Sequence, residues 1–400
     1  MVQAGPGNGG ARNGGQGNGG QHRGPSRFQR FLLPGFALKA VIIGGGYATG
    51  RELAEFFLPG GPWGGLAGMV LAMLIWSLVA ACTFLFARTV GAGDYRSFFE
   101  ALLGRGWVIF EVAYLLFIIL ILAVFGAAAG AIAEATLGLP AIAGTLALMA
   151  GIGFFATFGN ASVEQLFKWV SFLLYGVYAL FLVLALTTFG DRIPNGFMQP
   201  PPAAEAAGGW VLGGVTYAAY NIIGAVVILP VLRHMTSDRD AVVAGLVAGQ
   251  LAMAPAVIFF VCMIAFYPGI ALEVLPSDFL LGKLGSPAFH LLFQIMIFAA
   301  LLESGTGAVH AVNERIAKAW HVRRGAVLGR AARLAIALVI LTGCMLVADR
   351  VGLVALIATG YRAIAYVFLA VYLLPLLTLG LFRLVRRQRH MRAAPQPEIA

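Results

Sequence analysis

The sequence predicts an all-α, polytopic membrane protein with about ten transmembrane helices and no soluble globular domain. Of its 400 residues, 60% are hydrophobic and 11% are charged, and the mean hydropathy is +0.88. A soluble domain usually carries about 25% charged residues, so this chain has too few charges to cover a soluble surface. Apolar runs of roughly 20 residues, the length that crosses a bilayer, recur from Phe36 to Phe382.

These apolar runs divide the chain into two halves of five helices each. The expected spans are 35–58, 63–88, 107–136, 139–158, 164–188, 209–232, 240–266, 286–315, 326–347 and 353–382. We expect a first five-helix repeat at 31–188, an extracytoplasmic loop at 189–208, a second repeat at 209–383 and a cytoplasmic tail at 384–400. Residues 1–30 are rich in Gly, Asn and Gln and contain no acid, a composition typical of a disordered tail.

The basic residues set the expected orientation. With the N-terminus in the cytoplasm, 21 of the 27 Lys and Arg residues fall in inner segments, whereas the outer loops hold Arg192, Lys283 and Arg350. This asymmetry is the one that the positive-inside rule requires, so both termini are expected in the cytoplasm. It also explains the net charge of +10 without a nucleic-acid partner.

A break is predicted in the first span. The consecutive residues Gly44, Gly45 and Gly46 lie about 15 Å from its inner end, close to the bilayer midplane. Each Gly weakens a helix by about 1 kcal/mol, and irregular backbone at this depth is tolerated where it lines a cavity or is covered by protein. Close packing of small residues is the alternative. The adjacent Arg51 and Glu52 favour a cavity, because intramembrane charge is costly.

The sixth span repeats this design, with Gly, Thr216, Tyr217, Tyr220 and Asn221 at mid-depth, about 173 residues further along. Paired interrupted helices in two inverted halves are typical of the midplane site of a secondary transporter. We interpret the two tyrosines and the asparagine as substrate-binding candidates, with Thr216 and Thr49 as weaker ones. Ordinary aromatic packing is the alternative.

Two motifs resemble those of the YkvI-like bacterial membrane proteins. Residues 44–52 (Gly-Gly-Gly-Tyr-Ala-Thr-Gly-Arg-Glu) are similar to that family's Gly-x-Gly-aromatic-Ala-Ser-Gly-x-Glu segment. Residues 303–316 repeat its pattern of an acid followed by small residues and ending in Glu-Arg-Ile. The resemblance covers roughly residues 31–383. That family resembles the amino acid–polyamine–organocation superfamily, which implies the leucine-transporter fold in a bacterial cytoplasmic membrane.

The resemblance also implies roles for individual residues around broken helices one and six. The backbone N–H groups of Gly44, Gly45 and Gly46 would hold a substrate carboxylate, next to Tyr47. This role agrees with the positive N-terminal end of the half-helix that begins near Tyr47. Depth alone suggests a further role: Glu52 lies about 9 Å above the glycine break, so Glu52 and Arg51 would form an outer gate, unless they pair locally as helix-end charges.

Span eight carries the intramembrane acid Glu303, which costs roughly 2.5–3.5 kcal/mol to insert. Glu303, Ser304 and Thr306 offer the oxygen ligands that a coupling cation prefers. The resemblance implies a coupling-cation site between helices one and eight at about this depth. A structural ion pair of Glu303 with Lys39 or Lys168 is the alternative.

The sequence therefore predicts a secondary active transporter of a small organic solute, with an amino acid as one candidate. H⁺ or Na⁺ coupling is implied by the superfamily, and alternating access would be the mechanism. A membrane sensor or assembly factor that keeps the fold without transport is the alternative. Nucleotide-binding, metalloprotease and hydrolase motifs are lacking, so we expect neither an enzyme nor a cofactor. The three cysteines have no metal-ligand spacing, so we expect no metal site.

Overall fold

The structure is a computed structural model that describes residues 25–42, 47, 49–157, 160–201 and 209–386. All regular elements in these ranges are helices. Eight of the described helices are long and apolar enough to cross a membrane: Arg51–Val90, Tyr95–Leu137, Leu173–Phe197, Gly209–Val227, Asp238–Ile264, Pro287–Arg324, Arg330–Val351 and Leu353–Arg386.

Two of the ten predicted spans, the first and the fourth, are not among these eight. The first span is described in two parts: α1 (Leu33–Ile42), which directly follows the π-helical turn Phe28–Leu32, and α3 (Arg51–Phe56), which starts after Gly50, whose φ is 77°. The predicted break at Gly44, Gly45 and Gly46 lies outside the described residues. The fourth span, α7 (Ala141–Thr157), is apolar and 17 residues long, at the short end of the range that crosses a bilayer.

Four helices form a first packed set: α1, α4 (Gly61–Val90), α10 (Gly209–Asn221) and α12 (Asp238–Ile264). The α4 and α12 helices approach closely because α12 places small residues in the interface. A Cβ on Gly245 would collide with the backbone of Ala81, and one on Gly249 would collide with Ser77. Small residues at such positions let membrane helices approach until their backbones touch.

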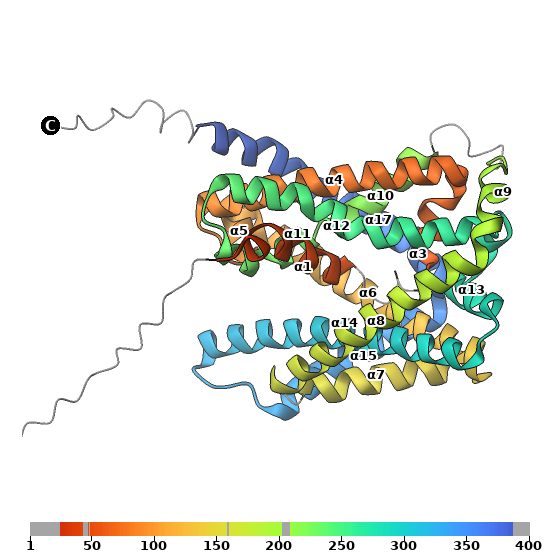
Figure 1. Ribbon diagram of the computed structural model, residues 1–400. Helices are drawn as coiled ribbons and strands as arrows, with labels where there is room; N and C mark the ends of the chain where they lie inside the picture. Colours follow the sequence, from red (N-terminus) through yellow and green to blue (C-terminus); the bar gives the residue numbers. More distant parts are fainter. Residues whose placement is uncertain (1–24, 43–46, 48, 158–159, 202–208, 387–400) are drawn as a thin grey trace, which may run out of the picture.

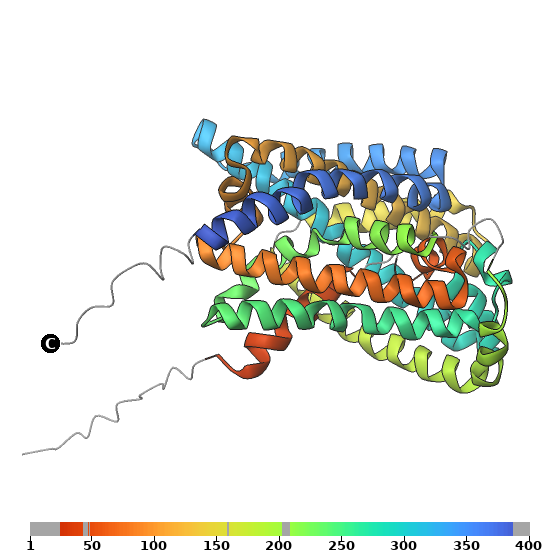
Figure 2. The same ribbon diagram turned by 90° about the horizontal axis from the view of Figure 1, so that it is seen from above.

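A second set consists of α6 (Trp107–Leu137), α7, α14 (Pro287–Arg324) and α15 (Arg330–Val351). Figure 1 shows α14, α15 and α7 on the side of the molecule opposite α4, α10 and α12. Helix α8 (Asn160–Phe189) packs against α14 and also contacts α12, so it bridges the two sets. Figure 2 shows the same long helices running roughly alongside one another when the molecule is turned by 90°.

The last span is irregular. It contains the π-helical turns Leu356–Tyr361, Leu369–Leu373 and Leu376–Gly380, with α17 (Arg362–Phe368) between the first two. Helix α17 packs on α10. Single π turns are frequent at functional sites. Tyr361, the last residue of the turn Leu356–Tyr361, lies next to Tyr220 of α10.

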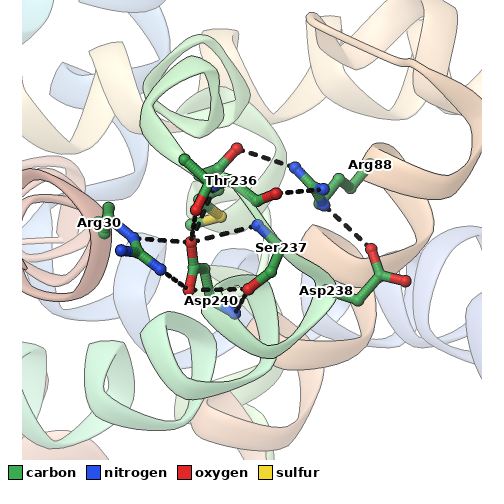
Figure 3. A network of polar contacts seen from close by, with 7 residues as sticks. Arg30, Arg88, Thr236, Ser237, Asp238 and Asp240 are labelled. Atoms are coloured by element: carbon green, nitrogen blue, oxygen red, sulfur yellow. Dashed lines mark hydrogen bonds and ion pairs between the residues drawn. The ribbon is translucent and has the colours of Figure 1, made fainter. Parts of the chain in front are cut away.

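A polar network, which we call the clamp, joins the π-helical turn Phe28–Leu32, directly before α1, and the beginning of α12 to the end of α4 (Figure 3). Arg30 donates two hydrogen bonds to Asp240, at 2.8 and 2.6 Å. Asp240 also accepts from the backbone N–H and the hydroxyl of Thr236, at 2.8 and 2.9 Å, and completes a capping box with Ser237 at the start of α12. Arg88 donates to Asp238 and to the carbonyl of Thr236, both at 3.0 Å.

Candidate functional site

A cavity of about 400 Å³ lies between α1, α6, α8, α11 (Gly224–Val227) and α14. It is lined by Ala40, Val41, Tyr114, Phe117, Ile118, Ile121, Phe125, Leu174, Tyr175, Ile223, Val227, Ala300, Glu303, Ser304, Gly307, Ala308 and Ala311. The half-helices α1 and α11 contribute to this wall, whereas α3 and the residues of α10 are absent from the described lining. The cavity therefore lies on one side of the two helix breaks.

The predicted cation site falls partly on this wall. Glu303 and Ser304 line the cavity, and Glu303 is the one charged side chain among the described lining residues. Thr306 is not among the described lining: its side chain is fully buried elsewhere on α14, and its hydroxyl has no hydrogen-bond partner among the residues that the structure describes. The structure thus brings together two of the three predicted cation ligands.

Lys39, one of the two alternative partners considered for Glu303, lies beside a different space. Its ammonium is 4.5 Å from the centre of the Tyr175 ring, and it lines a second cavity of about 180 Å³ between α1, α8 and α12. Leu174 and Tyr175 line both cavities, so the two spaces share a wall on α8. The side chain of Lys168 lies outside the described part of the chain.

The predicted substrate-binding side chains are gathered on the other side of the breaks. Thr49, Thr216, Tyr47, Tyr217 and Tyr220 are all buried, with at most 2% of each residue exposed. The side-chain amide of Asn221 caps the end of α10, where it donates a hydrogen bond to the carbonyl of Tyr217 at 3.0 Å. The rings of Tyr217 and Tyr220 are 5.6 Å apart, whereas the Tyr47 ring packs against Tyr178 of α8 at 6.2 Å, and none of these residues is among the described lining of either cavity.

We call the rings that fill this region the aromatic cluster: Phe56, Phe57, Tyr217, Tyr220 and Tyr361. The Tyr220 and Tyr361 rings are 4.4 Å apart, and the Phe57 and Tyr217 rings are 4.9 Å apart. Phe56 lies within 6.1 Å of Tyr217 and 5.8 Å of Tyr220. Aromatic pairs at these separations are favourable, so the cluster seals the α3 side of the two breaks.

Glu52 is tied to this cluster. It is 5% exposed, and its carboxylate accepts a hydrogen bond of 2.6 Å from the hydroxyl of Tyr220, which is 2% exposed. This bond connects α3, just after the first break, with α10, just before the second. Burial makes such a bond costly to break, because neither group finds water in its place.

Arg51 has partners different from those of Glu52. Its guanidinium pairs with Glu55 at 2.8 Å and donates to the carbonyls of Ala271 and Glu273, at 3.2 and 2.9 Å. Close by, the carbonyl of Thr49 accepts from the backbone N–H of Ser277 at 3.0 Å. The two predicted gate residues thus attach α3 to α10 and to the carbonyls of Ala271 and Glu273, and they do not pair with each other.

Sequence reasoning missed the aromatic side chains that complete both regions. Tyr361 belongs to the aromatic cluster, and Phe117, Phe125 and Tyr175 line the cavity. Aromatic residues make up 12% of the chain and occur in most spans, so no local signal separates these rings from ordinary core residues. The π turn that positions Tyr361 leaves no signature in the sequence either.

A third group of polar residues lies at the far end of α14. Arg315 pairs with Glu111 at 3.2 Å, and its guanidinium lies 4.4 Å from the rings of both Tyr95 and Tyr114. It belongs to the Glu-Arg-Ile motif, so this motif joins α14 to α6. Within the described ranges, no group of three or more His, Cys, Asp or Glu residues is arranged to hold a metal ion.

The geometry can be compared with known proteins. No family model matches the chain. The uncharacterised membrane protein YkvI of Bacillus subtilis (strain 168) is 26% identical over 298 residues, which cover 70% of this chain and 79% of YkvI. The chain is a distant homologue of YkvI. This finding confirms the resemblance that the two motifs indicated.

Solved structures show the fold. MhsT in complex with L-phenylalanine is 18% identical, covering 90% of this chain and 88% of its own, with a TM-score of 0.58. A Na⁺-coupled sialic acid symporter is 14% identical, covers 84% and 78%, and has a TM-score of 0.56. The manganese transporter of Eremococcus coleocola is 15% identical, covers 88% and 78%, and has a TM-score of 0.51. The chain is therefore a multi-pass membrane protein with the leucine-transporter fold of these transporters, none of which is an enzyme.

Proposed function

We propose that this protein is a secondary active transporter of a small organic solute, coupled to H⁺ or Na⁺. One observation carries the proposal: a cavity of about 400 Å³ opens on the α1 and α11 side of the two breaks, while the aromatic cluster closes the α3 side. Alternating access requires a site that is closed on one side while it is reachable from the other. The fold shared with three transporters supports the same conclusion.

The packing supports ten spans in two inverted halves. Each packed set takes two helices from either half: α1 and α4 join α10 and α12, and α6 and α7 join α14 and α15. Rocking of one set against the other around the broken helices is the motion that such repeats produce. We keep 31–188 and 209–383 as the two repeats, and 189–208 as the connection between them.

The positive-inside rule places the α1 side in the cytoplasm. With this orientation both termini are cytoplasmic, and the cavity faces inward in a bacterial cytoplasmic membrane. Arg51 and Glu52 then form the outer gate, which is shut in this conformation. Thr216, Tyr217 and Tyr220 would reach the solute after this gate opens, and Gly44, Gly45 and Gly46 would complete the site at the first break.

Glu303 and Ser304 are our candidates for the coupling site. A carboxylate and a hydroxyl suit either a proton or a hard cation such as Na⁺, and the cost of burying an acid is offset when it binds one of them. Replacement of Glu303 by Gln removes the charge and keeps the shape. The exposed Glu134 on α6, changed to Gln, is a matched control outside the cavity.

The test is solute-evoked current and uptake in proteoliposomes, screened with a library of small organic solutes under a Na⁺ gradient and then under a pH gradient. We expect at least one solute to move with one ion, and we expect Glu303→Gln, but not Glu134→Gln, to remove the ion dependence. If folded protein moves no solute under either gradient, the transporter proposal fails and the sensor or assembly alternative takes its place.

A further inference from the structure

The last three turns of α14 and the connection that follows, which we call the basic end, extend past the packed part of the helix. Helix α14 has 38 residues, so it is about 57 Å long, almost twice the hydrocarbon thickness of a bilayer. The connection 325–329 leads from it to α15, which begins at Arg330. In Figure 1 the basic end lies at the edge of the molecule.

An ion pair between α6 and α14 indicates the depth of this end. Arg315 of α14 pairs with Glu111, which lies one turn into α6 after its first residue, Trp107. Glu111 is about 6 Å from Trp107 along α6, and Trp320 is about 7.5 Å beyond Arg315 along α14. The two tryptophans therefore lie at nearly the same level, and tryptophan is enriched at the membrane–water interface.

The arginines that follow Trp320 reach the level of the lipid headgroups. Arg323 and Arg324 are about 4.5–6 Å further along α14, and the headgroup region adds roughly 5–7 Å to each side of the hydrocarbon core. The guanidinium of Arg324 also lies 4.7 Å from the centre of the Trp320 ring. An interfacial ring with a cation stacked on its outer side thus begins the basic end.

The basic end carries an excess of positive charge. The sequence contains no acid between Arg315 and Ala348. Two of the six basic residues in this stretch form ion pairs, Arg315 with Glu111 and Arg333 with Glu314. The other four are exposed: Lys318, Arg323, Arg324 and Arg330.

Apolar side chains stand among these charges. Val322 is 79% exposed and Val327 is 84% exposed, and Trp320 is 39% exposed. A surface that mixes exposed apolar and basic side chains is typical of segments that lie on an anionic membrane. There the apolar groups enter the boundary between headgroups and acyl chains, and the basic groups meet the phosphates.

We infer that the basic end binds the headgroups of anionic phospholipids in the leaflet beside it. The four exposed basic residues contact lipid phosphates, and Val322 and Val327 enter the acyl boundary. An acidic soluble protein would also suit the charge, but the depth of Trp320 and the two exposed valines favour the lipid surface. The inference goes beyond the proposed transport function and does not rest on it, because this surface lies outside the cavity.

The test is fluorescence quenching of the full chain in nanodiscs, with an environment-sensitive probe attached at Val327→Cys. The nanodiscs are made of phosphatidylcholine, and a minor part of the lipid is brominated phosphatidylglycerol or, in parallel, brominated phosphatidylcholine. We expect phosphatidylglycerol to associate with this site roughly fivefold or more tightly, the factor that one basic residue contributes near an anionic surface. High salt should remove most of the preference, because it screens exposed charges.

The triple variant Lys318→Gln, Arg323→Gln, Arg324→Gln should bring the two lipids to nearly equal association. The matched control changes three exposed basic residues near the opposite ends of the spans to Gln: Arg192, Lys283 and Arg350. It should keep the full preference. Thermal unfolding of each variant checks its fold, and protein without the reporter cysteine measures labelling of the native cysteines.

Three results would each overturn the inference. The first is equal quenching by the two lipids, and the second is a preference for phosphatidylglycerol that survives the triple variant or high salt. The third is a probe that neither brominated lipid quenches, which would place the basic end in water and leave it to a soluble acidic partner. Arg323→Gln alone repeats the test if the triple variant fails to fold, and it should weaken the preference severalfold.

Discussion

The hydrogen bond between Tyr220 and Glu52 should control how often the α3 side opens. Tyr220→Phe removes the hydroxyl and keeps the ring, which remains stacked 4.4 Å from Tyr361. Both partners are buried, at 2% and 5% exposure, so the loss is not screened by water in the closed conformation. Removing one such bond costs about 1–3 kcal/mol. The closed conformation is destabilised more than an open one, because water can hydrate Glu52 in the open conformation.

A change of this size raises the population of the open conformation about 5- to 150-fold. The assay is the rate of maleimide labelling at a cysteine placed by Ser277→Cys. Ser277 is 1% exposed, and its backbone N–H is bonded to Thr49 on the closed side. Labelling should accelerate by that factor when Tyr220→Phe is added to the reporter.

The matched control is Tyr372→Phe, which removes another buried hydroxyl bond, the 2.6 Å contact with Thr83. It lies away from the breaks and should leave labelling at position 277 unchanged. Background labelling of the native cysteines is measured without the reporter. Equal labelling rates with and without Tyr220→Phe, in protein that melts normally, would refute the role of this bond as a gate.

Three further predictions concern stability and the cavity. Asp240→Asn removes the ionic acceptor of the clamp. Because its partner Arg30 is 29% exposed, we expect the free energy of unfolding to fall by about 2 kcal/mol, measured by thermal unfolding. Arg96→Gln breaks the pair with Glu100, in which the side chains are 54% and 45% exposed, and should change stability by less than about 1 kcal/mol. Gly245→Ala should sharply lower expression and melting temperature, because the added Cβ meets the backbone of α4. The control Gly343→Ala has open space around it and should be neutral or stabilising by up to about 1 kcal/mol. Equal effects of the two variants would contradict this packing. Ala308→Phe adds a ring to the cavity wall and should abolish ligand binding with little change in melting temperature, and retained binding would show that the ligand sits elsewhere.

Much of the fold follows from local physics that the sequence displays. The hydrocarbon thickness dictates the span lengths, and the conformational freedom of glycine explains why α3 starts at Arg51, directly after Gly50, whose φ is 77°. The cost of an acid in a membrane singles out Glu303, which does line a cavity. Each of these inferences needs one segment of chain and the properties of the bilayer.

Other features depend on groups far apart in the sequence or on the conformation. Ser304 and Thr306 flank Glu303 on opposite sides of one helix face, at 100° per residue, so periodicity does not tell which flank meets the cavity. Arg30 and Asp240 are 210 positions apart, and nothing local pairs them. Tyr217 and Tyr220 lie at the predicted break, yet they pack against rings from α3 and the last span, because this conformation is closed on their side.

The clamp has a mechanical consequence for the half-helix α1. A short helix beside a break can rotate about that break independently of its neighbours. Arg30, however, lies in the π-helical turn directly before α1 and pairs with Asp240 of α12, and Arg88 joins the end of α4 to the same corner (Figure 3). The end of α1 that lies away from the break is thus attached to the start of α12. Any displacement of α1 carries the adjoining ends of α4 and α12 along, so the work against the surrounding lipid is shared by three helices.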